Sequence, residues 1–441
     1  MTQATSHRRE ILRLAVPAFL ALIAEPLFLL ADSAIIGHLG TAELAGLGVA
    51  SAALITAAGV FVFLAYGTTS VVARQLGAGD TRAAIAAGID GLWLAVGLGV
   101  ATAAFVATFA EPICAVFGAS EAVLVQATTY LRVSAFGIPG MLVILAVTGV
   151  LRGLQDTRTP LVASVLGFGA NVVLNLVFVY GLHWGIAGSA WGTVIAQTGM
   201  AAGLVLVLLR HARDRHAPLH PHPGRVLGAA RTGVPLLIRT LALRAALLLT
   251  TWLAASFGDV TLAAHQVALT VWSFLAFALD ALAIAAQAIV GRSLGAGDRE
   301  GVRSAMRTMI RWGVWGGLAI GLVVVAVHGV LPPLFTGEES VQAALSAALI
   351  VVGLGQAVAG YVFVIDGVLI GAGDGRWLAW GQVVSLLLYI PIVLALRSRG
   401  PSDSAVVDIV VLWLAFTFWM AIRGVVLGWR ARQDTWMVTG A

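Results

Sequence analysis

The chain of 441 residues has one cysteine, no lysine and few charges of either sign. Its single cysteine, Cys114, excludes a disulfide within the chain. Charged residues make up 11% of the sequence and hydrophobic residues 60%, whereas a soluble domain carries about 25% charged residues. Mean hydropathy is +0.97. These values exclude an ordinary soluble domain and favour an all-α polytopic membrane protein.

The apolar residues form long continuous runs, which are typical of membrane helices rather than of the alternating strands of a membrane barrel. Residues 1–10 are polar and the first run has no A-x-A-like cleavage site, so we expect a retained first span and no removed signal. The twelve predicted spans are residues 11–38, 44–74, 82–110, 121–152, 159–181, 186–210, 229–257, 261–292, 301–328, 340–370, 377–396 and 405–428.

Arginines gather at one set of alternate span ends and acids at the other, with Arg397 and Arg399 as exceptions. The positive-inside rule therefore predicts that both termini are cytoplasmic. We expect a multi-pass protein of a bacterial cytoplasmic membrane, in contact with the lipid bilayer. The net charge of +5 does not indicate nucleic-acid binding.

The two halves of the chain are a repeat. Val16-Pro17 recurs as Val234-Pro235, from position 16 to position 234, 218 residues later. The same shift relates two LGAGD segments, Leu76–Asp80 and Leu294–Asp298. Each half holds six spans, which predicts two six-helix lobes related by a pseudo-twofold axis along the membrane normal. The predicted division is an N-terminal lobe at 1–210, a cytoplasmic linker at 211–228 and a C-terminal lobe at 229–441.

Two features that could suggest ligand sites have simpler explanations. LGAGD lacks the Lys-Ser/Thr of a phosphate loop, and we interpret it as a helix end followed by an Asp cap. The linker contains four histidines but also several prolines and no cysteine. We therefore predict no metal site there and interpret it as a connection only.

The first span carries two acids and two prolines. A carboxylate in mid-membrane costs roughly 2.5–3.5 kcal/mol, so Glu25 and Asp32 are candidates for function. They are two helical turns apart and share a face, which must look into protein or water. Pro17 and Pro26 favour a bend in this span. The alternative is that Asp32 only bonds a neighbouring helix.

Several polar residues of the first half are not repeated in the second. Asp32, Asn171 and Thr193 correspond to Thr250, Tyr389 and Val411. Asn171 and Asn175 are one turn apart on one helix face. Asp32, Asn171, Asn175 and Thr193 could form a polar pocket, while the alternative is that the asparagines hold helices together.

The second half has its own charges within predicted spans. Asp280 and Asp366 are acids, and Arg239 and Arg244 are bases. Because buried opposite charges usually pair, we favour an ion pair between one of these arginines and one of these acids. A second coupling site is the alternative.

Five segments together resemble the multidrug and toxic compound extrusion (MATE) transporters, with the DinF-like branch most similar. They are AEPLFLLADSAIIGHLGT (Ala24–Thr41), LRGLQDTRTP (Leu151–Pro160), AAHQVAL (Ala263–Leu269), FALDALAIAAQAIVGR (Phe277–Arg292) and IDGVLIGAGD (Ile365–Asp374).

This resemblance implies export of amphipathic, often cationic small molecules in exchange for protons or sodium, by alternating access and without a cofactor. It implies that Asp32 is the coupling acid and that Asn171, Asn175 and Thr193 help to form its pocket. Several relatives have Asp where this chain has Asn175, which disfavours sodium at Asp32, Asn171, Asn175 and Thr193 and favours protons. We expect the transporter to be a monomer.

Two other functions remain as alternatives. A lipid or lipid-linked precursor flippase needs cations for phosphate, and Arg132, Arg239, Arg244 and Arg423 are available. An intramembrane enzyme is disfavoured, because no span carries a nucleophile–base motif or a His–carboxylate metal set. We therefore predict that the protein is not an enzyme.

Overall fold

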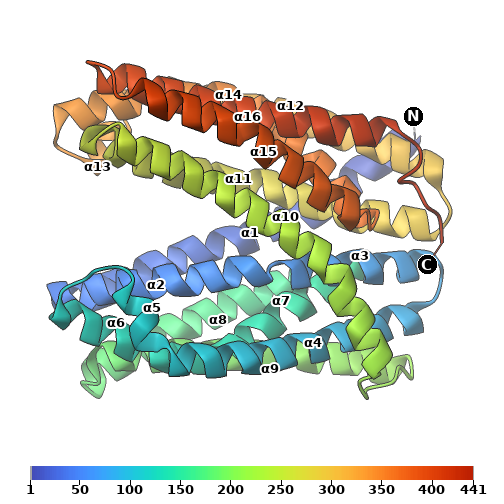
Figure 1. Cartoon of the computed structure of the whole chain (residues 1–441). Helices are drawn as coiled ribbons and strands as arrows, with labels where there is room; N and C mark the ends of the chain where they lie inside the picture. The colour runs from blue at the N-terminus through green and yellow to red at the C-terminus, as the bar shows by residue number, and fades with distance from the viewer. Residues whose placement is uncertain (1, 441) are drawn as a thin grey trace. The chain divides into compact units, whose positions relative to one another are not determined.

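The computed structural model describes residues 2–440, except for the side chains of residues 2–7 and of Glu25. Glu25 as a predicted inner-face acid therefore lies outside the described residues. Across the described range the regular elements are helices, which follow one another as Figure 1 shows. Twelve helical segments are long and apolar enough to cross a membrane. The predicted all-α fold with twelve spans is confirmed.

The first six spans correspond to eleven helical elements. These are α1 (Thr2–Gly37), α2 (Thr41–Phe61), α3 (Phe63–Gly77), α4 (Thr81–Thr108), α5 (Ala110–Ala115), α6 (Glu121–Ser134), η1 (Ala135–Gly137), α7 (Ile138–Gly153), α8 (Arg158–Leu176), η2 (Val177–Gly181) and α9 (Gly185–Asp214). Three spans that were predicted as single helices are subdivided, and the fifth changes from α8 to the π-helical segment η2. The second changes from α2 to α3 at Val62, and the fourth passes through the 3₁₀ turn η1.

The second half is made of seven helices. These are α10 (Pro223–Ser256), α11 (Asp259–Gly295), α12 (Arg299–Ala326), α13 (Pro332–Phe335), α14 (Glu339–Gly371), α15 (Gly375–Arg399) and α16 (Ala405–Arg432). Between α9 and α10 only residues 215–222 are outside helices, so the predicted linker at 211–228 is largely helical at both ends.

The chain divides into two compact units whose boundaries differ from the predicted lobes. The N-terminal unit comprises Val16–Gly233 and also includes Gly440, and the C-terminal unit comprises Met1–Ala15 and Val234–Thr439. The start of α1 therefore belongs to the C-terminal unit, although the rest of α1 belongs to the N-terminal unit. The start of α10 belongs to the N-terminal unit, although the rest of α10 belongs to the C-terminal unit. Both boundaries fall directly before a Val-Pro pair of the repeat, Val16-Pro17 and Val234-Pro235.

The LGAGD segments are helix ends, as the sequence predicts. Gly79 and Gly297 have φ angles of 86° and 77°, a left-handed conformation that glycine adopts without a steric penalty. Asp80 then accepts a hydrogen bond from the backbone N–H of Ala83 at 2.8 Å and caps α4. Asp298 caps α12 in the same way. These caps fix where the third span of each half begins.

Glycine spacing brings α12 and α14 into close contact in the C-terminal unit. Gly313, Gly317 and Gly321 recur every four residues along α12 and lie against α14. A Cβ atom on Gly317 would overlap the carbonyl of Gln356. Small residues at this spacing let two membrane helices approach to backbone contact.

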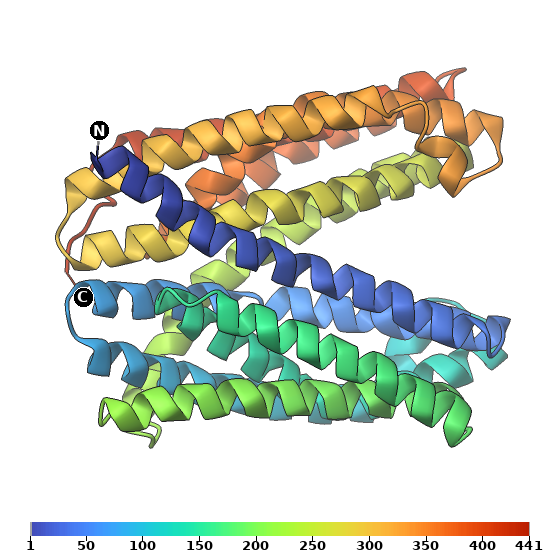
Figure 2. The same cartoon turned by 180° about the vertical axis from the view of Figure 1, so that it is seen from behind.

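Helix α1 runs without interruption through Pro17 and Pro26, as Figure 2 shows. Asp32 is 2% exposed, whereas Leu27 and Leu30 are 60% and 68% exposed. The acid therefore lies on the protein-facing side of α1 and the leucines on the outer side, as the cost of exposing a carboxylate to lipid requires.

Candidate functional site

Asp32 lies at the centre of a hydrogen-bonded cluster inside the N-terminal unit. Its Oδ1 accepts hydrogen bonds from Asn175 Nδ2 and from Ser189 Oγ, each at 2.7 Å. Its Oδ2 accepts a hydrogen bond from the Tyr130 hydroxyl at 3.2 Å. The donors come from α8, α9 and α6, so one carboxylate on α1 connects four helices.

Asn171 and Thr193 form a second bonded pair beside this cluster. Asn171 Nδ2 donates to Thr193 Oγ1 at 3.0 Å, which links α8 to α9 one turn from Asn175 and Ser189. Gly192 of α9 lies against Asn175, where a Cβ atom would overlap the amide oxygen. The missing side chain is therefore what lets Asn175 fit between α9 and Asp32.

The charge of Asp32 is stabilised by neutral groups. An amide and two hydroxyls donate to it, and the ion pairs among the described residues do not include it. Hydrogen bonds to a charged acceptor are stronger than neutral ones, yet they leave a net charge of one buried in the unit. That charge can be removed only by a proton or by a mobile cation.

Two acceptor atoms in the cluster have no hydrogen-bond partner among the described side chains and backbone. These are the amide oxygens Oδ1 of Asn171 and Asn175, both buried. An amide carries both donors and an acceptor, so a half-turn of either side chain would present its oxygen instead of its nitrogen. The cluster therefore holds spare acceptors for a proton or a cation that enters it.

The four residues predicted for this site lie in one region, in two bonded groups. Asp32 and Asn175 bond directly, whereas Asn171 and Thr193 bond to each other. Tyr130 and Ser189 also belong to the cluster and were not predicted from the sequence. Ser189 is four residues before Thr193, the same spacing as Asn171 and Asn175, so helical periodicity could have identified it.

A π-helical turn follows the asparagines. Segment η2 begins directly after α8, and Tyr180 within it donates its hydroxyl to the backbone carbonyl of Ile35 at 2.6 Å. Such turns are frequent at functional sites. Here the turn attaches the fifth span to α1 just one turn after Asp32.

In the C-terminal unit the structure pairs Arg239 with Asp366, a choice that the sequence left open. Arg239 Nε donates to Asp366 Oδ1 at 3.1 Å, and its Nη2 contacts Oδ2. Both side chains are buried. A second buried arginine, Arg423, donates from Nε to Gln382 Oε1 at 2.9 Å and lies 4.0 Å from Asp366. Arg244 is exposed, and Asp280 is half-buried on α11.

The repeat counterparts of the Asp32 cluster also meet. The hydroxyls of Thr250 and Tyr389 are 2.9 Å apart, so α10 and α15 are joined where α1 and α8 are joined in the first half. The counterparts of Asn175 and Thr193 are Val393 and Val411. The contact between helices is thus repeated, but its carboxylate is not.

Among the described side chains, no three His, Cys, Asp or Glu residues lie close enough together to hold a metal ion. Of the linker histidines, His222 donates its backbone N–H to Asp90 at 3.3 Å.

The family model MatE matches residues 17–177 and 235–394, one segment in each half of the repeat. The chain belongs to the MatE family. Its MATE relatives include DETOXIFICATION 44, chloroplastic, of Arabidopsis thaliana, 32% identical over 97% of this chain and 82% of the relative. DNA damage-inducible protein F of Escherichia coli is 29% identical over 98% and 94%. This similarity is consistent with the DinF-like branch.

The fold is also that of solved MATE structures. The Vibrio cholerae MATE transporter VcmN in its bent form superposes with a TM-score of 0.88 at 21% identity, covering 99% of this chain and 100% of that one. The protein is therefore a MATE multidrug and toxic compound efflux transporter with the two-lobe, twelve-span fold. Its spans and its bacterial relatives indicate a multi-pass inner-membrane protein.

Proposed function

We propose that this MATE protein exports amphipathic cations in exchange for protons, and that Asp32 is the group that carries the proton. The supporting observation is the set of donors around Asp32: Asn175, Ser189 and Tyr130 all direct hydrogens at its carboxylate. A proton neutralises such a carboxylate without any further ligand, since the spare amide oxygens can accept from the acid once it is protonated.

Protonation of Asp32 would rearrange the hydrogen bonds of the cluster. A carboxylate only accepts hydrogen bonds, but a carboxylic acid also donates one, so an amide or hydroxyl beside Asp32 has to turn an oxygen towards it. The bonds between α1 and α6, α8 or α9 then rearrange, which gives the proton a differential effect on two conformations. If the two conformations open the site to opposite sides of the membrane, the proton and the exported cation are exchanged by alternating access.

Sodium is the second candidate, favoured by one specific observation. The unpartnered oxygens of Asn171 and Asn175 are hard ligands of the kind that sodium and calcium prefer. Against it, Asn175 now presents its NH₂ group rather than its oxygen to Asp32. Sodium binding would require this amide to turn over, whereas a proton on Asp32 can be accommodated when the Tyr130 hydroxyl turns its hydrogen away and accepts from the acid.

Phosphate-carrying substrates, as a flippase would need, have weaker support. Arg239 is already paired with Asp366, and Arg423 is held by Gln382. Arg132 and Arg244 are exposed on their helices. We also infer that the transporter acts as a monomer with both termini in the cytoplasm, because the Asp32 cluster is complete within one chain and arginines mark that side.

Asp32→Asn tests the proposal, because it keeps the size of the side chain but cannot bind a proton. We expect reconstituted Asp32→Asn protein to lose uphill efflux of a lipophilic cation driven by an imposed pH gradient, while its melting temperature in detergent stays close to wild type. Thr250→Val is the matched control at the repeat position, and we expect it to retain coupling to the gradient. Uphill efflux at the wild-type rate by Asp32→Asn would show that another group carries the proton.

A further inference from the structure

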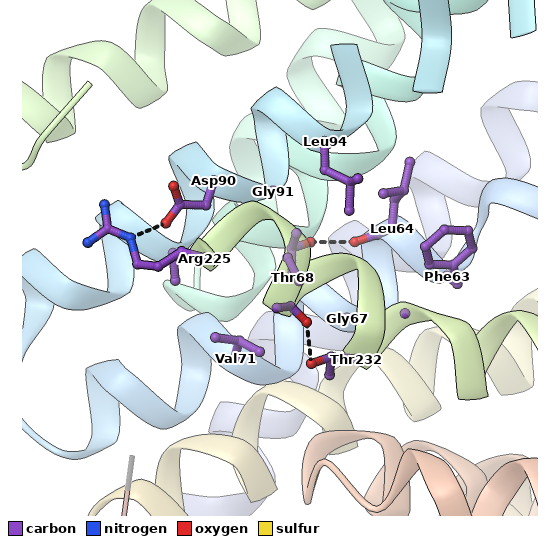
Figure 3. Close-up of a pocket in the computed structure, with 14 residues that line it drawn as sticks. Phe63, Leu64, Gly67, Thr68, Val71, Asp90, Gly91, Leu94, Arg225 and Thr232 are labelled. Atoms are coloured by element: carbon purple, nitrogen blue, oxygen red, sulfur yellow. Dashed lines mark hydrogen bonds and ion pairs between the residues drawn. The ribbon is translucent and has the colours of Figure 1, made fainter. Parts of the chain in front are cut away.

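A pocket of about 260 Å³ lies in the N-terminal unit between α3, α4 and the first turns of α10 (Figure 3). Its walls are mostly apolar or small, with Leu64, Val71 and Leu94 among the apolar ones. The volume is somewhat below the roughly 300–1,000 Å³ of sites for drug-sized ligands. The pocket can therefore admit the aromatic or alkyl end of an amphiphile.

One buried carboxylate lies in the pocket wall, and its partner is a half-exposed arginine. Asp90 belongs to a candidate membrane span, and its side chain is 3% exposed. Arg225, at the start of α10, donates from Nε to Asp90 Oδ2 at 2.7 Å, yet its own side chain is 50% exposed. Figure 3 shows the two side chains meeting at one end of the pocket.

This arrangement favours a cationic ligand over an anionic one. A cation can take the place of Arg225, because the half-exposed guanidinium can move into water while Asp90 keeps a positive partner. An anion would have to take Arg225 from Asp90 and leave a buried carboxylate unpaired, which is costly. The hydroxyls of Thr68 and Thr232 offer no alternative for an anion, since each already donates to a carbonyl of its own helix.

The connection between the halves stays attached when Arg225 moves. Trp93 Nε1 donates to the carbonyl of Leu219 at 3.1 Å, and the backbone N–H of His222 donates to Asp90. A swing of one side chain is therefore enough to expose Asp90. The repeat supports a specific role for this acid, because the position 218 residues later is Thr308 and carries no charge.

We propose that this pocket is a second ligand site for amphipathic cations, with Asp90 as the counter-ion and Arg225 as a tethered cation that the ligand displaces. This proposal rests on the proposed function, because the ligand belongs to the same class as the exported substrate. The pocket itself is separate from the Asp32 cluster.

Equilibrium binding to the purified full-length protein in phosphatidylcholine nanodiscs, with no gradient, tests the site. The probes are 1-methylquinolinium, a two-ring cation, and naphthalene-2-sulfonate, an anion of similar size. We expect the cation to bind, and Arg225→Gln to bind it about tenfold more tightly because the competing guanidinium is gone. Arg231→Gln removes an exposed arginine from the same helix outside the pocket lining and should change nothing.

Filling the pocket provides the second variant. Gly228 lines the pocket, and a Cβ atom there meets open space, so Gly228→Leu is the variant chosen to fill the cavity. We expect it to weaken binding of 1-methylquinolinium at least tenfold, as should Asp90→Asn. Gly316→Leu, on α12 and equally open at its Cβ, is the control and should bind as wild type.

The proposal fails if Gly228→Leu leaves cation binding unchanged, if Arg225→Gln does not tighten it, or if wild type and Arg225→Gln both fail to bind the cation. It also fails if the sulfonate binds and Arg225→Gln abolishes that binding, which would indicate an anion site such as one for lipid headgroups. Asp32→Asn separates the two proposals, because it should stop uphill efflux and leave 1-methylquinolinium binding at this pocket intact.

Discussion

Asn175 is the residue whose substitution would distinguish a proton from a metal cation at the proposed coupling site. Its amide donates to Asp32 at 2.7 Å. In Asn175→Asp two carboxylates would meet at that distance, and like charges so close cannot both ionise without a cation between them. We therefore predict that Asn175→Asp makes efflux depend on sodium, measured as transport rate across a sodium titration at fixed pH.

Asn171→Asp is the matched control for this prediction. It introduces the same charge one turn away, beside Thr193 rather than Asp32, so its response to sodium should be smaller. An Asn175→Asp protein that ignores sodium would mean that the missing second acid is not what disfavours this ion.

Part of this site could be predicted from the sequence by comparing the two repeats, but contacts between different helices could not. Asp32, Asn171, Asn175 and Thr193 differ from their counterparts in the repeat, and that contrast identifies them without a structure. Tyr130 comes from a span that carries no other signal, and its contact with Asp32 depends on how α6 packs against α1. Sequence spacing within one helix does not report such a contact.

At the scale of helices, α10 and α14 are joined by the buried pair Arg239–Asp366. Removing one partner leaves the other charge buried and alone, so Arg239→Met or Asp366→Asn should each lower the free energy of unfolding by about 3–5 kcal/mol. Arg239→Met combined with Asp366→Leu should recover most of this loss, measured as melting temperature in detergent. A stable but transport-dead Asp366→Asn would instead indicate a second coupling site.

Helices α12 and α14 depend on glycine rather than on charge. A Cβ atom on Gly317 would overlap the Gln356 carbonyl, so Gly317→Ala must push the two helices apart and should cost about 1–3 kcal/mol or more. Gly316→Ala is the neighbouring control, with open space at its Cβ, and should be neutral or slightly stabilising. Equal melting temperatures for the two variants would contradict the close packing.

The positions of the twelve spans followed from the sequence because each is a long apolar run, whereas the breaks within them did not. The junction at Val62 lies within an apolar run, and the π-helical turn at Val177–Gly181 lies at the end of one. Their cause is tertiary packing, such as the bond from Tyr180 to Ile35. Hydropathy reports burial in lipid and carries little information on these local changes of helix geometry.

At the scale of the whole molecule, the division of the chain follows the repeat more closely than the predicted lobes do. Both unit boundaries precede a Val-Pro pair, inside α1 and inside α10. The sequence predicts the boundary in the linker, because polar, proline-rich composition usually marks a boundary. The ion pairs Glu10–Arg292 and Asp90–Arg225, each formed within one unit, show instead that residues before each Val-Pro pair are held by the opposite half of the sequence.

This placement predicts that the two repeat prolines allow α1 and α10 to bend during transport. A proline within a helix removes one backbone hydrogen bond and lowers the resistance to bending. Pro17→Ala and Pro235→Ala should therefore slow the turnover of efflux several-fold while leaving the melting temperature unchanged or higher. Pro391→Ala changes a proline inside α15, within one unit, and should not slow turnover. If all three variants transport at the wild-type rate, the boundaries at Val16 and Val234 are not sites of bending.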